Sequence, residues 1–131
     1  MISDEFNGVN NMSRITVVGS GYVGIANACM LAKHNTVTIL DIDKARVDMV
    51  NAKRATVADK CVQEYLDNEV LSLTATTNQE DAYTNAEWVI IATPTDYDEN
   101  KNYFNTDTIK SCIRDCLEYN PQANIIIKST I

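Results

Sequence analysis

The chain has 131 residues, of which 45% are hydrophobic and 22% charged, proportions typical of one globular domain rather than of a disordered chain. Its net charge of −7 repels phosphate backbones and anionic lipids, so neither nucleic acid nor a membrane surface is an expected partner. No apolar run approaches the ~20 residues that a membrane-spanning helix needs.

Residues 1–12 are polar and acidic and do not resemble a signal peptide. We expect them to form a leader that is disordered or foreign to the natural chain, and residues 13–131 to form the folded domain. The four cysteines fall in predicted helices without metal-type spacing: Cys29, Cys61, Cys112 and Cys116. Reduced thiols packed in the core are expected, which is consistent with a cytoplasmic protein.

β-type and helical stretches alternate through the first half of the domain. The pattern predicts a strand at 14–18, a helix at 22–33, a strand at 36–40, a helix at 43–53 and a helix at 58–69. Asp43 is a good N-cap, and Val47 and Val50 are expected to point inward. In the next helix, Val62 and Val70 are assigned to the apolar face.

The second half continues the alternation. Strands are predicted at 71–76, 88–92 and 124–128, helices at 80–86 and 107–118, and a polar loop at 93–105. The apolar run at 88–92 is typical of a strand buried on both faces, and Trp88 is expected to pack in the core. The run at 124–128 is expected to form a last buried strand. The whole pattern predicts an α/β fold: a Rossmann-type, doubly wound, mostly parallel sheet flanked by helices, with strand order 3-2-1-4-5.

Three glycines follow the first strand and open the first helix. Gly19 permits a tight turn, Gly21 lets a pyrophosphate approach the backbone, and Gly24 allows the helix to pack closely. The N–H groups near Tyr22 and Val23 would then face the phosphates at the positive end of the helix dipole. This context predicts a dinucleotide site more strongly than the glycine spacing does alone.

An acidic residue ends the second strand. Asp41 lies 22 residues after Gly19, close to the usual spacing of about 20, and its carboxylate would bind the adenosine ribose hydroxyls and repel a 2′-phosphate. NAD is therefore expected rather than NADP. Arg46 is an argument in the other direction, because an arginine near this position could also bind a phosphate.

The loops after the fourth and fifth strands should line the same crevice, because they follow the strands at the switch point of the sheet. Thr93–Thr95 and Ser129–Thr130 stand there, and their hydroxyls could bind the cofactor. His34, at the end of the first helix, is expected to have a surface or capping role. The acidic run Asp96–Asn100 lacks the spacing of a calcium-binding loop, and no metal is expected.

Five segments occur in the order found in one enzyme family: GSGYVG at 19–24, ILDID at 39–43, VIIATPTDYD at 89–98, NYFNT at 102–106 and IKSTI at 127–131. Over residues 13–131 the chain resembles the amino-terminal NAD-binding domain of the UDP-glucose/GDP-mannose dehydrogenase family, in particular its UDP-glucose 6-dehydrogenase branch.

The resemblance implies oxidation of a sugar C6 alcohol to a carboxylate with two NAD, through a thioester on a catalytic cysteine. It places Tyr22 and Val23 at the pyrophosphate, and Asp41 and Arg46 near the adenosine ribose. Thr95 would contact the cofactor. Thr130 would lie near the nicotinamide and position a catalytic water, which its neutral hydroxyl is too weakly basic to deprotonate unaided.

The resemblance also implies that the catalytic cysteine and the nucleotide-sugar domain lie beyond Ile131, so that this piece alone would be inactive. A full-length homodimer is the expected assembly. Two alternatives remain: a related enzyme acting on UDP-N-acetylmannosamine or GDP-mannose, and a non-catalytic NAD-binding regulatory module.

Overall fold

The computed structural model describes residues 13–93, 96–98, 103–105 and 107–128, with 96–98 and 103–105 described as backbone alone. Thr95 and Thr130 lie outside these ranges. Within them, no helix is both long enough and apolar enough to cross a bilayer.

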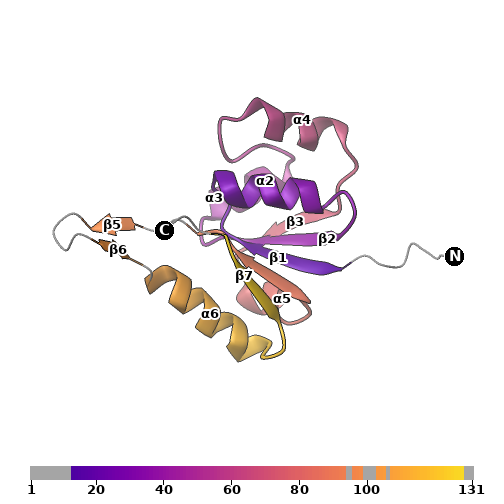
Figure 1. Ribbon diagram of the computed structural model, residues 1–131. Coiled ribbons are helices and arrows are strands. Elements are labelled where there is room, and N and C mark those ends of the chain that lie inside the picture. Colours follow the sequence, from indigo (N-terminus) through magenta and orange to yellow (C-terminus); the bar gives the residue numbers. More distant parts are fainter. Residues whose placement is uncertain (1–12, 94–95, 99–102, 106, 129–131) are drawn as a thin grey trace, which may run out of the picture.

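A five-stranded parallel sheet forms the centre of the fold (Figure 1). Its strands, in spatial order, are β3 (Leu73–Thr76), β2 (Thr36–Leu40), β1 (Arg14–Val18), β4 (Trp88–Ile91) and β7 (Asn124–Ile127). Each neighbouring pair is parallel. Because β7 is the fifth strand of this sheet in chain order, the predicted order 3-2-1-4-5 is confirmed, and so is the doubly wound fold.

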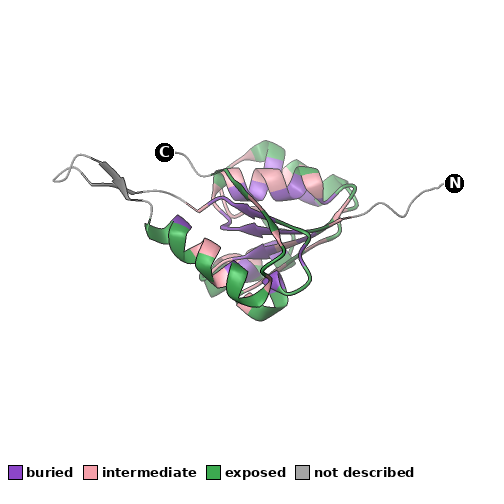
Figure 2. Ribbon diagram, turned by 60° about the horizontal axis from the view of Figure 1, so that its bottom comes forward, coloured by how far each residue is buried: buried purple, intermediate pink, exposed green. Residues whose placement is uncertain are grey.

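Helices cover the two faces of the sheet. One layer contains α2 (Tyr22–Leu31), α3 (Lys44–Asn51) and α4 (Lys60–Asn68), and the other contains α5 (Gln79–Tyr83) and α6 (Asp107–Tyr119). Alternate residues of the central strands point into opposite layers: Val17 packs with the first and Val18 with the second. Figure 2 shows the buried strands between helices whose outer surfaces are exposed.

Local sequence explains the boundaries of several helices. The side chain of Asp43 accepts a hydrogen bond from Ala45 N–H and caps α3, as predicted, and Val47 and Val50 are buried. Asp59 caps α4 in the same way by accepting from Val62 N–H. The predicted polar loop at 93–105 contains two short antiparallel strands, β5 (Asp96–Asp98) and β6 (Tyr103–Asn105).

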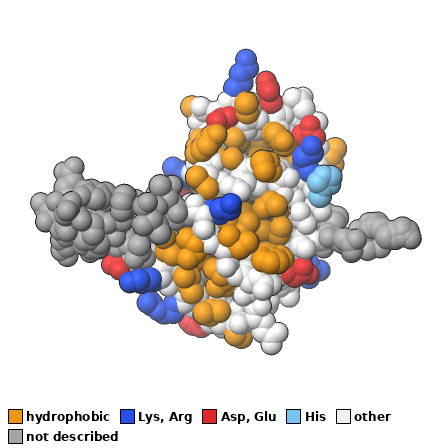
Figure 3. Space-filling view, viewed as in Figure 1, with side chains coloured by type: hydrophobic (Ala, Val, Ile, Leu, Met, Phe, Trp, Pro, Cys, Tyr) orange, Lys and Arg blue, Asp and Glu red, His pale blue; other side chains and the backbone are white. Residues whose placement is uncertain are grey.

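The prediction that the strand at 124–128 is buried was wrong. β7 pairs only with β4 among the described strands, and Ile127 is 47% exposed. Ile125 packs against the layer of α5 and α6, whereas Ile126 is exposed on the other side, where α2 covers β1 and β2 instead. Figure 3 shows hydrophobic side chains gathered on the face where β7 lies. An apolar run therefore does not distinguish a central strand from an edge strand.

Three other burial predictions were also wrong. Trp88 begins β4 at its amino end and is 40% exposed, and Val70 follows the end of α4 and is 96% exposed. Cys61 lies on the exposed side of α4, whereas Cys29 and Cys116 are buried as expected. Trp88 and Val70 are exposed because burial near the end of an element depends on which neighbours extend past it, whereas Cys61 is exposed because it lies away from the buried side of α4.

Candidate functional site

The turn between β1 and α2 lies at the switch point of the sheet. The chain runs from β1 toward β2 and β3 on one side, and returns to β4 and β7 on the other. Crevices outside the carboxyl ends of strands at such a point are where open α/β sheets bind ligands. Gly19 N–H donates to Leu40 O at 2.8 Å, and Ala92 N–H donates to Val18 O at 2.9 Å, so three strand ends meet at this turn.

The fold requires two of the three glycines, each for a different structural reason. Gly19 has φ +101°, a conformation that favours glycine, and a Cβ there would lie 3.1 Å from Ala92 O. A Cβ on Gly24 would lie only 2.1 Å from Gly19 O, so helix α2 could not pack on the turn with any side chain at this position. Gly19 and Gly24 are therefore required by the fold itself.

Gly21 is required for neither reason. Its φ of −71° is open to any residue, and a Cβ there would meet no atom of the described residues within 4 Å. Helix α2 begins directly after it without a side-chain cap or an acidic residue in its first turn. Open space in front of an uncapped helix N-terminus, beside Tyr22 and Val23, fits an anionic group such as a pyrophosphate.

Asp41 lies at the end of β2 and contacts the turn directly. Its Oδ2 accepts hydrogen bonds from Ser20 N–H at 3.0 Å and from the Ser20 hydroxyl at 2.5 Å, and its Oδ1 accepts from Asp43 N–H at 2.9 Å. A carboxylate has about four lone-pair positions, so these three bonds leave about one for an incoming hydroxyl. The negative charge nevertheless stays beside the turn.

Arg46 lies in the first turns of α3 and faces Asp43 rather than the glycine turn. Its Nε is 3.8 Å from Asp43 Oδ2, in an i,i+3 pair on the helix surface. A weak exposed pair of this kind contributes little to stability. The pair does, however, place the guanidinium beside a carboxylate. A 2′-phosphate there would be repelled by Asp43 as well as attracted by Arg46.

The structure adds three observations about the site. The hydroxyl of Thr93 is buried without a hydrogen-bond partner in the described part of the chain, next to the turn. The Ile42 side chain, adjacent to Asp41, is 98% exposed. The Thr56 hydroxyl donates to Ser20 O at 2.5 Å. Thr93 was expected at this edge from its place after the fourth strand, whereas Ile42 and Thr56 were not singled out, and no sequence signal marks Thr56.

Three of the cysteines, Cys29, Cys112 and Cys116, lack the features of an activated nucleophile. Burial raises the pKa of Cys29 to about 11. Burial is also the main cause that raises the pKa of Cys112, and it raises that of Cys116. Thiols whose pKa is raised remain protonated at neutral pH and are poor nucleophiles. These groups support the core.

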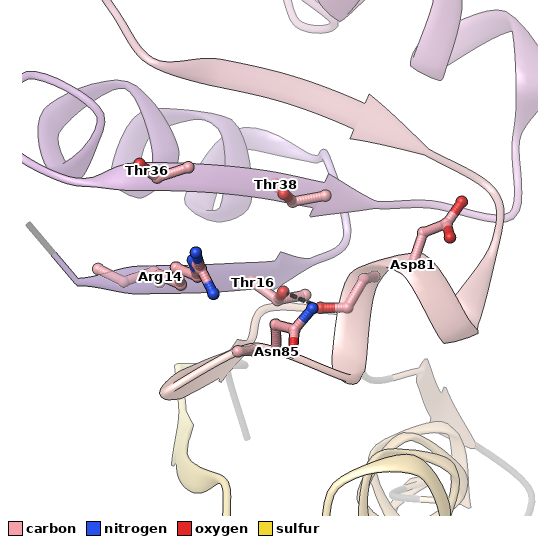
Figure 4. Close-up of a pocket in the computed structure, with 9 residues that line it drawn as sticks. Arg14, Thr16, Thr36, Thr38, Asp81 and Asn85 are labelled. Carbon is pink, nitrogen blue, oxygen red and sulfur yellow. Dashed lines mark hydrogen bonds between the residues drawn. The ribbon is translucent and has the colours of Figure 1, made fainter.

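A small cavity of about 70 Å³ lies elsewhere, between β1, β2 and α5 (Figure 4). Its polar side chains include Arg14, Thr16, Thr38 and Asp81, and Thr16 Oγ1 donates to Ala82 O. The cavity is far too small for a dinucleotide. Arg14 and Thr36 also come from the amino ends of their strands, so it is distinct from the glycine turn.

Fold and turn together define a dinucleotide-binding domain of the Rossmann type. Comparison with known proteins narrows this class. Residues 13–131 match the model of the UDP-glucose/GDP-mannose dehydrogenase family, NAD binding domain, and the chain belongs to this family. NAD is accordingly the cofactor of the domain, and two features fit such a ligand: the space at Gly21, and the Thr93 hydroxyl, which has no partner among the described residues.

Two relatives align with nearly the whole chain. A UDP-glucose 6-dehydrogenase of Campylobacter jejuni is 41% identical over 120 residues, and one of Streptococcus pneumoniae is 39% identical over 118 residues; each alignment covers 90% of this chain. The chain spans about 30% of the length of these relatives.

A solved structure shares the fold. The UDP-N-acetyl-mannosamine dehydrogenase of Staphylococcus aureus superimposes with a TM-score of 0.78 at 26% identity, over 91% of this chain and 29% of that one.

Proposed function

We propose that this chain is the NAD-binding domain of a UDP-glucose 6-dehydrogenase, which oxidises UDP-glucose to UDP-glucuronate with two NAD. The relatives at 41% and 39% identity that carry this name support the choice of substrate. The single structural observation that carries the cofactor half of the proposal is the open space at Gly21 in front of the uncapped helix α2.

Within the domain, each element would bind a different part of the cofactor. The N–H groups of Tyr22 and Val23 would bind the pyrophosphate, and Asp41 would accept a hydrogen bond from the adenosine ribose. Ile42, exposed beside Asp41, offers an apolar surface for the adenine ring. When bound, NAD supplies the hydride acceptor, and these residues hold and orient its adenosine half.

Asp41 is the reason to expect NAD rather than NADP. A 2′-phosphate would approach a carboxylate that Ser20 already holds at the turn, and the nearby Arg46 is paired with Asp43. Calorimetric titration with both cofactors tests this. Clearly tighter binding of NADP would contradict the assignment of Asp41.

Thr95 and Thr130 keep the roles that the resemblance gives them. Thr95 would contact the cofactor, and Thr130 would lie near the nicotinamide and position a catalytic water. Substitution of either by valine in the full-length enzyme should lower NADH formation, and an unchanged rate would remove that residue from the site.

The substrate proposal concerns the whole protein. In the full-length enzyme we expect NADH to form with UDP-glucose, two molecules for each sugar oxidised, and no turnover by this chain alone. NADH formation only with UDP-N-acetylmannosamine or GDP-mannose would favour a related dehydrogenase, and the Staphylococcus aureus neighbour makes the first of these the main alternative. No NADH with any of the three would favour a non-catalytic NAD-binding regulatory module.

We also propose that the full-length protein is a cytoplasmic homodimer. The four free cysteines are consistent with a reducing compartment. Cell fractionation and light scattering test the location and the assembly, and a membrane-bound or monomeric enzyme would contradict them.

A further inference from the structure

The segment between α3 and α4 lies against the glycine turn. Thr56, in this segment, donates its hydroxyl to Ser20 O at 2.5 Å across 36 residues of sequence. Ser20 is only 1% exposed, and its own N–H and hydroxyl both donate to Asp41. Thr56, Ser20 and Asp41 thus form one hydrogen-bonded chain that links three loops at the edge of the sheet.

This bond fixes the orientation of a peptide unit inside the turn. The peptide between Ser20 and Gly21 is trans, so its carbonyl and its N–H point in opposite directions. Because Thr56 holds the carbonyl, the Gly21 N–H is turned away from Thr56. A glycine has no side chain that could hold the peptide by packing, and it is conformationally permissive. An external hydrogen bond is therefore an effective way to keep this turn in one conformation.

The segment that carries Thr56 is itself held in place. Gln63, on α4, makes two hydrogen bonds to this segment. Its Oε1 accepts from Ala55 N–H at 2.9 Å, and its Nε2 donates to Lys53 O at 3.0 Å. Lys53 turns the chain with a φ of +61°, and Val57 packs against the hydrophobic core of the layer that contains α2. The position of Thr56 is thus determined by α4 and the core rather than by a free loop.

We propose that Thr56 is a positioning residue of the cofactor site, which holds the glycine turn in its NAD-binding conformation through the carbonyl of Ser20. Thr56 does not itself need to touch the cofactor. The inference rests on the proposed function, because it assumes that the turn binds the pyrophosphate of NAD.

The test compares three variants of this chain by NMR titration with NAD and by thermal unfolding. Thr56→Val keeps the shape of the side chain and removes the donor, and we expect the NAD Kd to rise about tenfold, the effect of losing one part-buried hydrogen bond. Thr56→Ser keeps the hydroxyl and should restore the affinity. Thr16→Val is the matched control, because Thr16 also donates to a backbone carbonyl, that of Ala82, in the other helix layer.

The control separates positioning from general stability. Thr16→Val should lower the unfolding temperature and leave the NAD Kd of the folded protein within about twofold of the original value, since it lies outside the site. Equal weakening of NAD binding by Thr16→Val and Thr56→Val would overturn the inference, as would an unchanged Kd in Thr56→Val. If Thr56→Val does not fold, Gln63→Met replaces it, because this substitution removes the hydrogen bonds that hold the segment carrying Thr56. It should raise the NAD Kd about threefold. An unchanged NAD Kd in Gln63→Met would also overturn the inference.

Different results would contradict the NAD assignment and the role of Thr56. If the unaltered chain shows no NAD binding, the cofactor assignment fails and the role of Thr56 fails with it. If the unaltered chain binds NAD and Thr56→Val binds it equally well, only the role of Thr56 is lost.

Discussion

Ser20 and Asp41, 21 residues apart, are joined by two hydrogen bonds to a single carboxylate oxygen. The bonds link the turn after β1 to the end of β2, two neighbouring parallel strands whose carboxyl ends meet at one edge. Asp41 therefore has a structural role at the turn besides the ribose contact expected of it. A substitution at Asp41 should affect both the stability of the turn and the choice of cofactor.

Asp41→Asn tests the electrostatic part of that dual role. Removal of the charge should weaken NAD binding and bring the NADP affinity closer to it, with the ratio of the two Kd values changing about tenfold. Ser20→Ala is the matched control, because it removes one bond to Asp41 and leaves the charge. A ratio that changes equally in both variants would show that charge is not what excludes NADP.

Gly21→Ala should separate binding from folding. Among the described residues no atom lies within 4 Å of the added Cβ, and the backbone conformation is open to alanine, so stability should rise slightly, by about 0.4–1 kcal/mol. NAD affinity should fall by an order of magnitude or more, because the methyl group occupies the space in front of the helix N-terminus. Denaturant unfolding and NAD titration measure the two effects, and undiminished NAD affinity would place the pyrophosphate elsewhere.

Gly24→Ala should do the reverse and affect the fold first. The added Cβ would lie 2.1 Å from Gly19 O, a backbone atom that cannot move without opening the contact between α2 and the turn. We expect a loss of at least about 1–3 kcal/mol in the free energy of unfolding, the usual effect of overpacking a core. Urea denaturation checks this, and a stability equal to that of Gly21→Ala would show that α2 shifts freely.

Ile42→Ser tests the apolar surface beside Asp41. The side chain is 98% exposed, so its removal should change the free energy of unfolding by less than about 0.5 kcal/mol. If the adenine ring packs there, the NAD Kd should rise several-fold. Val70→Ser is the control, because Val70 is 96% exposed outside the site and should leave the Kd unchanged. Equal Kd values for the two variants would remove Ile42 from the site.

Cys29 should make the protein less stable in alkali. Burial raises its pKa to about 11 from the ordinary value of 9.0, so the folded chain holds the proton more tightly than the unfolded chain. That stabilisation is complete below pH 9 and is lost as the pH rises through 11, at about 1.4 kcal/mol for each pH unit at most. Unfolding of Cys29→Ala between about pH 8 and pH 11 should show a shallower decline than the original protein. Parallel declines would mean that Cys29 ionises freely in the folded state.

The parts of the fold that follow from local pattern were predictable. The boundaries of β1 and β2 match the sequence expectation residue for residue, because each strand is an apolar, β-branched run that ends at a glycine or an aspartate. The cap at Asp43 was predictable for a similar reason, since a short acidic side chain before a helix accepts its first free N–H groups. The exposure of β7 and Trp88 was not, because it depends on what packs beside them.

The candidate site likewise has features that the sequence predicts and features that only the structure shows. The glycine turn, the acidic residue after β2 and the family could all be recognised from the amino-acid sequence, because the spacing and chemistry of these residues are local properties of a βαβ unit. The three-dimensional arrangement was needed to show that Gly24 serves packing whereas Gly21 leaves open space, that Ser20 holds Asp41, and that Thr56 reaches the turn. These contacts join segments 5 to 36 residues apart, and they exist only because the parallel strands and α4 bring those segments to one edge of the sheet.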